Sequence, residues 1–227
     1  MFPVQLFYTF AAMRSTPSLY QQYRLAVAVT FLLVLAAVGL LLAYGKEQSF
    51  VLLNGLNTPA LDRLMPYVTY LGDGLIYIPI LLLTYFFRRD YLVAIIAGIL
   101  LCTLFSQGMK NWIYPEELRP FSLEAKQIAI HKVEGVELHR KYSFPSGHTS
   151  TAFTCALLLA ALLRQRIWVI AMPFVALAVG FSRIYLAQHF LTDVTAGMMI
   201  GIVSSYLALL IYRRYHEWRM RKALQKL

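Results

Sequence analysis

Residues Ser182–Asp193 read SRIYLAQHFLTD and lie between two strongly apolar runs. The stretch places His189 and Asp193 four residues apart, a spacing that brings two side chains together on one face of a helix. A carboxylate beside an imidazole orients the ring and stabilises its cation, and Arg183 can add a fixed positive charge. Because charges at the edge of a membrane are costly unless function uses them, we interpret the stretch as a nucleophile, its orienting acid and a phosphate clamp.

The composition indicates a membrane protein. Of the 227 residues, 59% are hydrophobic and 14% are charged, whereas a soluble domain carries about 25% charged residues. The mean hydropathy is +0.59. Both cysteines, Cys102 and Cys155, fall inside apolar runs, so we expect them to be reduced core residues.

The apolar runs predict an all-α fold, an integral membrane bundle of six helices. The expected spans are Leu25–Tyr44, Tyr67–Phe87, Tyr91–Met109, Thr149–Leu163, Ile167–Phe181 and His189–Tyr212. A loop of about twenty residues is expected after the first span, and very short basic turns after the second and fourth.

These spans divide the chain into three parts. Residues 1–24 are expected to be a cytoplasmic or interfacial segment, residues 25–212 the six-span domain, and residues 213–227 a basic cytoplasmic tail. Within the domain, residues 111–147 form the long polar connection between the third and fourth spans. Apolar and polar residues alternate there about Glu134 and Gly135, which predicts a short hairpin.

The charges predict the orientation. Six spans put both termini on one side, and that side holds 12 Lys/Arg against two acids, whereas the other holds 9 Lys/Arg against nine acids. The positive-inside rule therefore places both termini in the cytoplasm and the long loop outside. The net charge of +10 then belongs to the cytoplasmic face, where it favours anionic lipid rather than nucleic acid as the partner of the tail.

With this topology, three separate pieces converge on the external face. Lys110 ends the third span and Arg119 follows in the loop, a pair that taken alone is typical of a snorkelling lysine and a surface arginine. Phe144–Thr149 reads FPSGHT at the start of the fourth span. There Ser146 is a good helix cap, Gly147 lets an anion approach the backbone, and His148 is placed to donate a proton. The third piece is Ser182–Asp193.

Together the pieces resemble the type 2 phosphatidic acid phosphatases, the PAP2 or lipid phosphate phosphatase superfamily, most closely its bacterial phosphatidylglycerophosphatase B-like membrane branch. That family carries a lysine followed by RP, a PSGH motif and an SR-x5-H-x3-D motif on a six-helix core. The PSGH motif is complete at Pro145–His148, and the third motif is complete from Ser182 to Asp193. The resemblance covers roughly residues 66–212.

One motif departs from the family pattern. The family places six residues between the lysine and RP, whereas eight lie between Lys110 and Arg119. Either the loop bulges at Pro115–Leu118, or Lys110 contacts phosphate from a shifted position.

The resemblance and the residue chemistry imply one mechanism. Neutral His189 attacks phosphorus and forms a phosphohistidine, while Asp193 holds the tautomer. His148 protonates the leaving oxygen and then activates water. The phosphate would be bound by Lys110, Arg119, Ser146, Gly147 and Arg183. No cofactor and no metal is expected.

The expected substrate is a lipid phosphate at the membrane surface, such as undecaprenyl diphosphate, phosphatidylglycerol phosphate, phosphatidic acid or a lipid A phosphate. The expected location is the inner membrane of a bacterium, with the active site on its external face. A phosphotransferase that uses the same site with an acceptor other than water is the main alternative. A vanadate-dependent haloperoxidase conflicts with six spans, and a transporter would need charges deeper in the spans.

Overall fold

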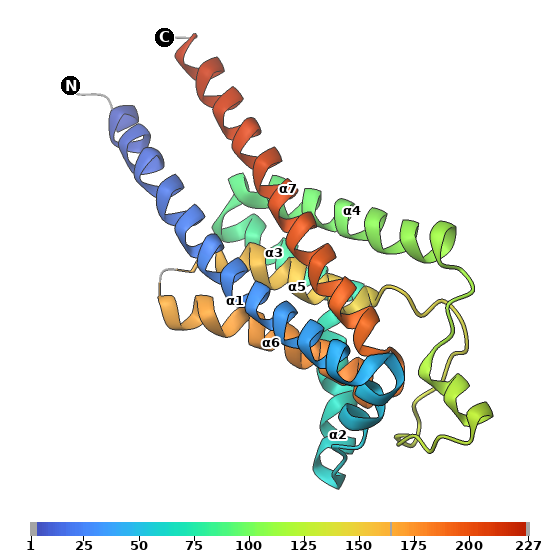
Figure 1. Cartoon of the computed structure of the whole chain (residues 1–227). Helices are drawn as coiled ribbons and strands as arrows, with labels where there is room; N and C mark the ends of the chain where they lie inside the picture. The colour runs from blue at the N-terminus through green and yellow to red at the C-terminus, as the bar shows by residue number, and fades with distance from the viewer. Residues whose placement is uncertain (1–3, 164, 226–227) are drawn as a thin grey trace.

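The computed structural model describes the backbone of residues 4–163 and 165–225 and the side chains from residue 19 onward. Over that range the regular elements are all helical, which confirms the all-α prediction. The seven α-helices are α1 (Val4–Asn54), α2 (Pro59–Val68), α3 (Tyr77–Phe87), α4 (Leu92–Gly108), α5 (Gly147–Ala160), α6 (Arg166–Tyr185) and α7 (Leu191–Leu224). The long helices α1 and α7 carry the two ends of the chain to the same end of the molecule (Figure 1).

The chain is a multi-pass membrane protein. Among the described residues, four segments are long and apolar enough to cross a bilayer: Leu19–Asn54, Arg89–Ile113, Arg166–Tyr185 and Leu191–Leu224. The pair Pro59–Gly72 and Gly74–Phe87, bent by 60°, makes a fifth if it is one span. Helix α5 has only 14 residues, short of the roughly 20 that a bilayer needs, so the count of six spans stays a prediction.

The expected loop after Tyr44 was wrong, because α1 continues as a helix to Asn54. Gly45, at φ +73° and ψ 179°, is not helical, so two helical segments meet there at a kink. Beyond the kink, Phe50 is fully buried and packs edge-on against Phe190, with ring centroids 5.5 Å apart. The residues after the kink therefore bury part of their apolar surface against the turn that precedes α7. At the other end, α1 is helical from Val4, and the cytoplasmic or interfacial placement of residues 1–24 stays a prediction.

The second predicted span is broken at Gly72–Asp73–Gly74. Asp73 is extended and its Oδ1 accepts the N–H of Leu75 at 2.9 Å, so it caps the helical turn that follows. Gly72 lies against the start of α5, where an added Cβ would stand 2.6 Å from the carbonyl oxygen of His148. The break thus holds a polar turn directly beside the FPSGHT stretch.

Helix α5 is the centre of the bundle, and α4, α6 and α7 pack around it, as Figure 1 shows. Ten of its residues are buried. Contact with α7 is close because α7 presents glycines: an added Cβ at Gly201 would stand 2.4 Å from Phe153 Cβ, and one at Gly197 would stand 2.9 Å from Ser146 O. This packing fixes the start of α5 relative to the start of α7.

The prediction of a short hairpin about Glu134 and Gly135 was correct for the turn but wrong for the two strands. The segment does turn at Glu134–Gly135, where the N–H of Val136 donates to Val133 O at 3.3 Å, but the described residues 127–141 form no strand. Each arm bonds to the bundle instead: the N–H of His131 donates to Asn54 Oδ1 at 2.7 Å, and Gln188 Nε2 donates to Glu137 O at 2.8 Å. Because the backbone groups find these partners, no ladder between the arms is needed.

Candidate active site

Six of the eight predicted site residues line a single cavity of about 480 Å³ between the long loop and the ends of α4, α5 and α6. They are Lys110, Arg119, Gly147, His148, Arg183 and His189. The other two, Ser146 and Asp193, are fully buried and stand outside the cavity lining. Residues from three distant parts of the chain therefore meet at one place.

The turn before α7 presents His189 to the cavity. Helix α6 ends at Tyr185, and the carbonyl oxygen of Arg183 accepts the N–H groups of Gln188 at 2.9 Å and His189 at 3.2 Å. Ala187 takes a left-handed conformation with φ +53°, which reverses the chain. The sequence predicted that His189 and Asp193 lie together on a helix. They do lie together, but His189 precedes α7 and reaches Asp193 across the helix start.

Asp193 is an orienting acid held by several donors. Its Oδ2 lies 3.3 Å from His189 Nδ1 and accepts the N–H of Phe190 at 2.9 Å. A third donor, the hydroxyl of Ser143, lies 2.5 Å from the same oxygen. A carboxylate at Nδ1 fixes the N–H there and leaves Nε2 with a free lone pair. The arrangement suits a nucleophile or a base at Nε2.

Sequence analysis missed Ser143. It lies in the loop two residues before Pro145, in no pattern that marks a functional residue, and it is fully buried. Its backbone N–H donates to Glu117 O at 3.0 Å, which ties the end of the loop to its beginning. The loop therefore supplies part of the environment of Asp193.

Burial governs the protonation of His189. The residue is 2% exposed, and burial lowers its pKa to about 3 although the Asp193 carboxylate acts in the opposite direction. The nearby cations Arg183 and Arg119 lower the pKa further. The ring is therefore neutral at pH 7, the form that can attack an electrophile.

Helix α5 directs its first turn at the cavity. Ser146 is the N-cap, and its Oγ accepts the N–H of Thr149 at 3.4 Å and lies 2.8 Å from Thr149 Oγ1. Ser146 is fully buried and is not among the residues that line the cavity. Gly147 does face it, and a Cβ there would meet nothing within 4 Å. The N-terminus of a helix with open space in front of it is a favourable place for an anion.

His148 has a partner that the sequence did not identify. Its Nε2 lies 3.9 Å from Asp73 Oδ2, and the two side chains are 31% and 38% exposed. Asp73 is held in place by its bond to Leu75 N–H. The only sequence signal was the unusual Gly-Asp-Gly inside an apolar run. Burial and the nearby Arg183 lower the pKa of His148 to about 4, and the Asp73 carboxylate opposes that shift.

The two arginines are held differently. Arg183 is 9% exposed; its Nη1 donates to Thr69 Oγ1 at 2.8 Å, and its Nε has no partner among the described residues. Arg119 donates from Nε to Lys141 O at 2.9 Å and from Nη1 to Gln188 Oε1 at 3.0 Å. Arg183 thus keeps a donor for a ligand, whereas Arg119 also ties the loop to the turn before α7. Burial lowers the pKa of Arg119, and Asp193 opposes that shift.

Lys110 reaches the cavity although its spacing from Arg119 departs from the family pattern. Helix α4 passes into a π-helical turn, Met109–Ile113, and the chain then turns at Pro115–Glu116 before Arg119. A π turn takes one residue more than an α turn. The extra residues are therefore absorbed by the π turn and the bend, and both cations still face the same space.

The described residues contain no group of three His, Cys, Asp or Glu side chains that could hold a metal ion. The acids near the cavity are engaged singly, Asp193 with His189 and Asp73 with His148. The positive charge of the site comes from the cationic side chains.

Comparison with known proteins identifies the family. The sequence profile of the PAP2 superfamily matches residues 89–217. Lipid A 4'-phosphatase from Porphyromonas gingivalis is 26% identical over 171 residues, covering 74% of this chain and 72% of the relative. Phosphatidylglycerophosphatase B from Bacillus subtilis is 27% identical over 169 residues, covering 66% and 74%.

Solved structures show the same fold. LpxE from Aquifex aeolicus superposes with a TM-score of 0.61 at 31% identity, covering 72% of this chain and 94% of that one. The transmembrane PAP2 type phosphatidylglycerolphosphate phosphatase from Bacillus subtilis superposes with a TM-score of 0.57 at 23% identity, covering 83% and 96%.

Proposed function

We propose that this chain, which belongs to the PAP2 superfamily and is a lipid phosphatase, hydrolyses a lipid phosphate through a phosphohistidine on His189. The observation that carries the proposal is the cavity itself. It gathers a buried neutral histidine, a second histidine and three cations at one end of a membrane bundle. Such a set can bind a phosphate, attack it and protonate what leaves.

In the first step, Nε2 of His189 forms a bond to phosphorus while the bond from phosphorus to the lipid oxygen breaks. Asp193 stabilises the imidazolium that develops, and His148 gives its proton to the departing oxygen. Arg183, Lys110 and the first N–H groups of α5 compensate the charge on the phosphoryl oxygens. Arg119 fixes the loop against the turn that carries His189.

In the second step, His148 is neutral and takes a proton from water as the water attacks the phosphohistidine. Inorganic phosphate and free His189 result. Asp73 supports both roles of His148, because a nearby carboxylate orients the ring and stabilises its cation.

The phosphate donor is proposed to be one of the lipids on which relatives act. Relatives are named as phosphatases of lipid A, of undecaprenyl diphosphate and of phosphatidylglycerophosphate, and phosphatidic acid carries the same phosphomonoester. We place the protein in the inner membrane of a bacterium with the cavity on the external side.

The intermediate can be trapped. We would incubate a His148→Ala variant with 32P-labelled p-nitrophenyl phosphate, whose leaving group needs no acid. Phosphorylation should proceed while hydrolysis stalls for lack of a base, so label should accumulate on the protein in an acid-labile, base-stable bond. His148→Ala/His189→Ala should take up no label, and His216→Ala, a histidine at the far end of α7, should turn over normally without accumulating it. Label on the double variant would refute the assignment of His189.

A panel of lipid phosphates in detergent tests the reaction class. Phosphate release should survive EDTA and be blocked by vanadate, a mimic of the phosphoryl transition state. Loss of release on chelation would contradict the metal-free mechanism. Transfer of label to a second lipid without release of phosphate would favour the phosphotransferase.

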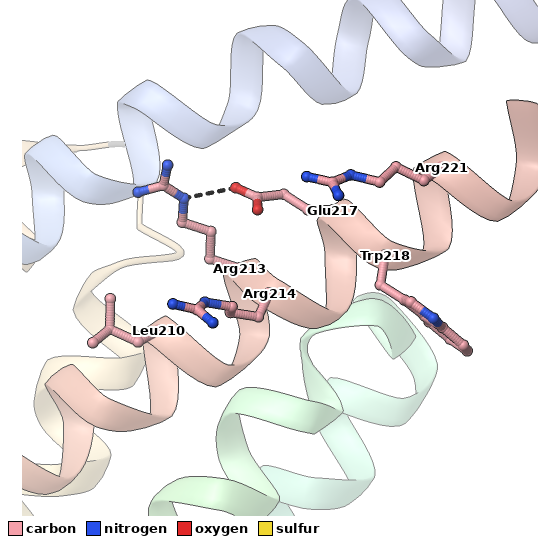
Figure 2. A pocket seen from close by; sticks show the side chains of 6 residues that line it. All are labelled: Leu210, Arg213, Arg214, Glu217, Trp218 and Arg221. Atoms are coloured by element: carbon pink, nitrogen blue, oxygen red, sulfur yellow. Dashed lines mark hydrogen bonds and ion pairs between the residues drawn. The ribbon is translucent and has the colours of Figure 1, made fainter.

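At the opposite end of the molecule, we propose that the end of α7 holds anionic lipid. Arg213, Arg214 and Arg221 line a groove of about 540 Å³ together with Trp218 (Figure 2), and only Arg213 is shown paired there, with Glu217 at 2.8 Å. Basic side chains beside a membrane gain roughly 1 kcal/mol each from an anionic surface.

A further inference from the structure

The active-site cavity is lined by a third histidine that the proposed mechanism does not use. His139 comes from the long loop and lines the cavity together with His148 and His189. Its side chain is 56% exposed, and among the described residues its ring makes one ion pair, in which Nδ1 lies 4.0 Å from Glu137 Oε1. The ring is therefore accessible to a ligand, and an imidazole has at least one N–H donor in either protonation state.

The arm of the loop that carries His139 is fixed on both sides of this residue. On the N-terminal side, Gln188 Nε2 donates to Glu137 O at 2.8 Å. On the C-terminal side, the backbone N–H of Arg119 donates to Arg140 O at 2.9 Å. Gln188 is 3% exposed and directly precedes the nucleophile in the chain. The backbone of His139 is therefore held beside the same turn that presents the nucleophile.

The side chain of Arg119 uses most of its hydrogen-bonding capacity to hold this arm. A guanidinium has five N–H donors. In Arg119, Nε donates to Lys141 O at 2.9 Å and Nη2 donates to Tyr142 O at 3.3 Å. Nη1 donates to the carbonyl oxygen of Gln188 at 3.2 Å and to its Oε1 at 3.0 Å. Four of the five N–H groups therefore bind protein acceptors, so Arg119 brings its charge to the site but leaves one N–H group for a ligand.

Resting on the proposed function, we propose that His139 is a substrate-binding residue, which donates a hydrogen bond to a phosphate oxygen from the loop side of the cavity. The residue lines the same cavity as the nucleophile, its ring is accessible, and its backbone is anchored to Arg119 and Gln188. The phosphate oxygen belongs either to the group that His189 attacks or to the second phosphate of a diphosphate lipid. A contact that is equally strong in the bound substrate and in the transition state lowers KM and leaves kcat unchanged.

The binding of two inert anions tests this contact without any turnover. The probes are inorganic phosphate and methylenediphosphonate, a diphosphate analogue that resists hydrolysis, and their Kd values follow from the rise in unfolding temperature in detergent. His139→Leu should raise the Kd by about five- to tenfold, the usual effect of one hydrogen bond. His139→Gln keeps an N–H donor and should recover most of the binding. His216→Leu, the same substitution at a distant histidine, should change neither Kd.

Kinetics on a lipid phosphate that the parent protein hydrolyses give a second readout. For His139→Leu, KM should rise by about five- to tenfold while kcat stays at the parent value. A fall in kcat with an unchanged KM would contradict a binding role. Without an added anion, His139→Leu should unfold at the parent temperature, because the ring that it replaces is largely exposed.

The outcomes separate the contact from the proposal on which it rests. Weaker binding of inorganic phosphate in His139→Leu assigns the contact to the phosphate under attack. Weaker binding of methylenediphosphonate alone assigns it to a second phosphate, and the substrate is then a diphosphate lipid. Parent-like binding of both anions, or a His139→Gln protein as weak as His139→Leu, overturns the inference. If both anions bind through His139 but the parent releases phosphate from no lipid, the proposed function fails and the contact stands.

Discussion

Adding one methyl group at Gly197 should disturb catalysis without touching any catalytic side chain. Gly197 lies one turn after Asp193 on α7 and faces the start of α5. A Cβ there would stand 2.8 Å from Thr149 Cβ and 2.9 Å from Ser146 O, whereas ordinary contacts lie at about 3.4–4 Å. Relief requires the two helix starts to separate by roughly 0.5–1 Å, and a shift of that size in an active site can cost about 100-fold in rate.

The perturbation has two expected readouts. For Gly197→Ala, kcat on a short-chain lipid phosphate should fall by about 10- to 100-fold, because His148 moves relative to His189. Overpacking should also lower stability by about 1–3 kcal/mol, measured by thermal unfolding in detergent. Gly39→Ala is the control: its Cβ would meet nothing within 4 Å, so kcat should not change. A Gly197→Ala protein with the parent kcat would refute the idea that this contact sets the spacing of the two histidines.

Three further predictions concern the partners of the catalytic groups. Ser143→Ala removes a donor 2.5 Å from Asp193, so kcat should fall about tenfold, the size expected for a bond to a charged group; an unchanged kcat would show that the loop does not support Asp193. Asp73→Asn should slow hydrolysis of alkyl phosphates several-fold but barely affect the first turnover of p-nitrophenyl phosphate, whose leaving group needs no proton from His148; burst kinetics measure both. Because His189 has a pKa of about 3 when folded and about 6.5 when unfolded, the unfolded chain alone takes up a proton below pH 6.5, and stability should fall by about 2 kcal/mol between pH 6.5 and 5. Thermal unfolding against pH should show this loss in the parent protein, and an equal loss in His189→Asn would assign it elsewhere.

The site could be predicted from sequence to the extent that its residues lie in short motifs. Lys110, His148 and Arg183 carry chemistry in their own residue types, and the topology of the apolar runs was enough to expect them on one face. The structure places them around one cavity. Complete motifs could therefore be predicted from the sequence. They include the pair Lys110 and Arg119, whose unusual spacing is accommodated by a π turn.

What could not be predicted depends on contacts between distant segments. Ser143 has no motif, and only the fold shows that its hydroxyl meets Asp193. Asp73 looked like part of an interrupted span, and its place beside His148 follows from the packing of Gly72 on α5. Ser146 was expected both to cap α5 and to bind phosphate; the structure shows the cap, and the phosphate contact stays a prediction.

The predicted end of the first helix was wrong for a related reason. The charges at Lys46 and Glu47 suggested that the first span was followed by a loop. In the structure these side chains pair with Glu117 and Lys126 of the long loop, so the helix continues past the apolar run. Hydropathy reports where a chain leaves the bilayer, and a helix that packs on other protein outside it can continue.

The cluster of cations in the cavity also has a consequence for the stability of the protein. Lys110, Arg119 and Arg183 face one space whose described lining contains no carboxylate, so an anion bound there reduces the repulsion among the three cations. Inorganic phosphate is such an anion, and it is the product. A ligand at 100 times its Kd adds about 2.7 kcal/mol to the stability of a folded protein. The phosphate ion that the enzyme releases therefore also stabilises its fold. In a solution rich in phosphate, the protein should unfold less readily and turn over substrate more slowly.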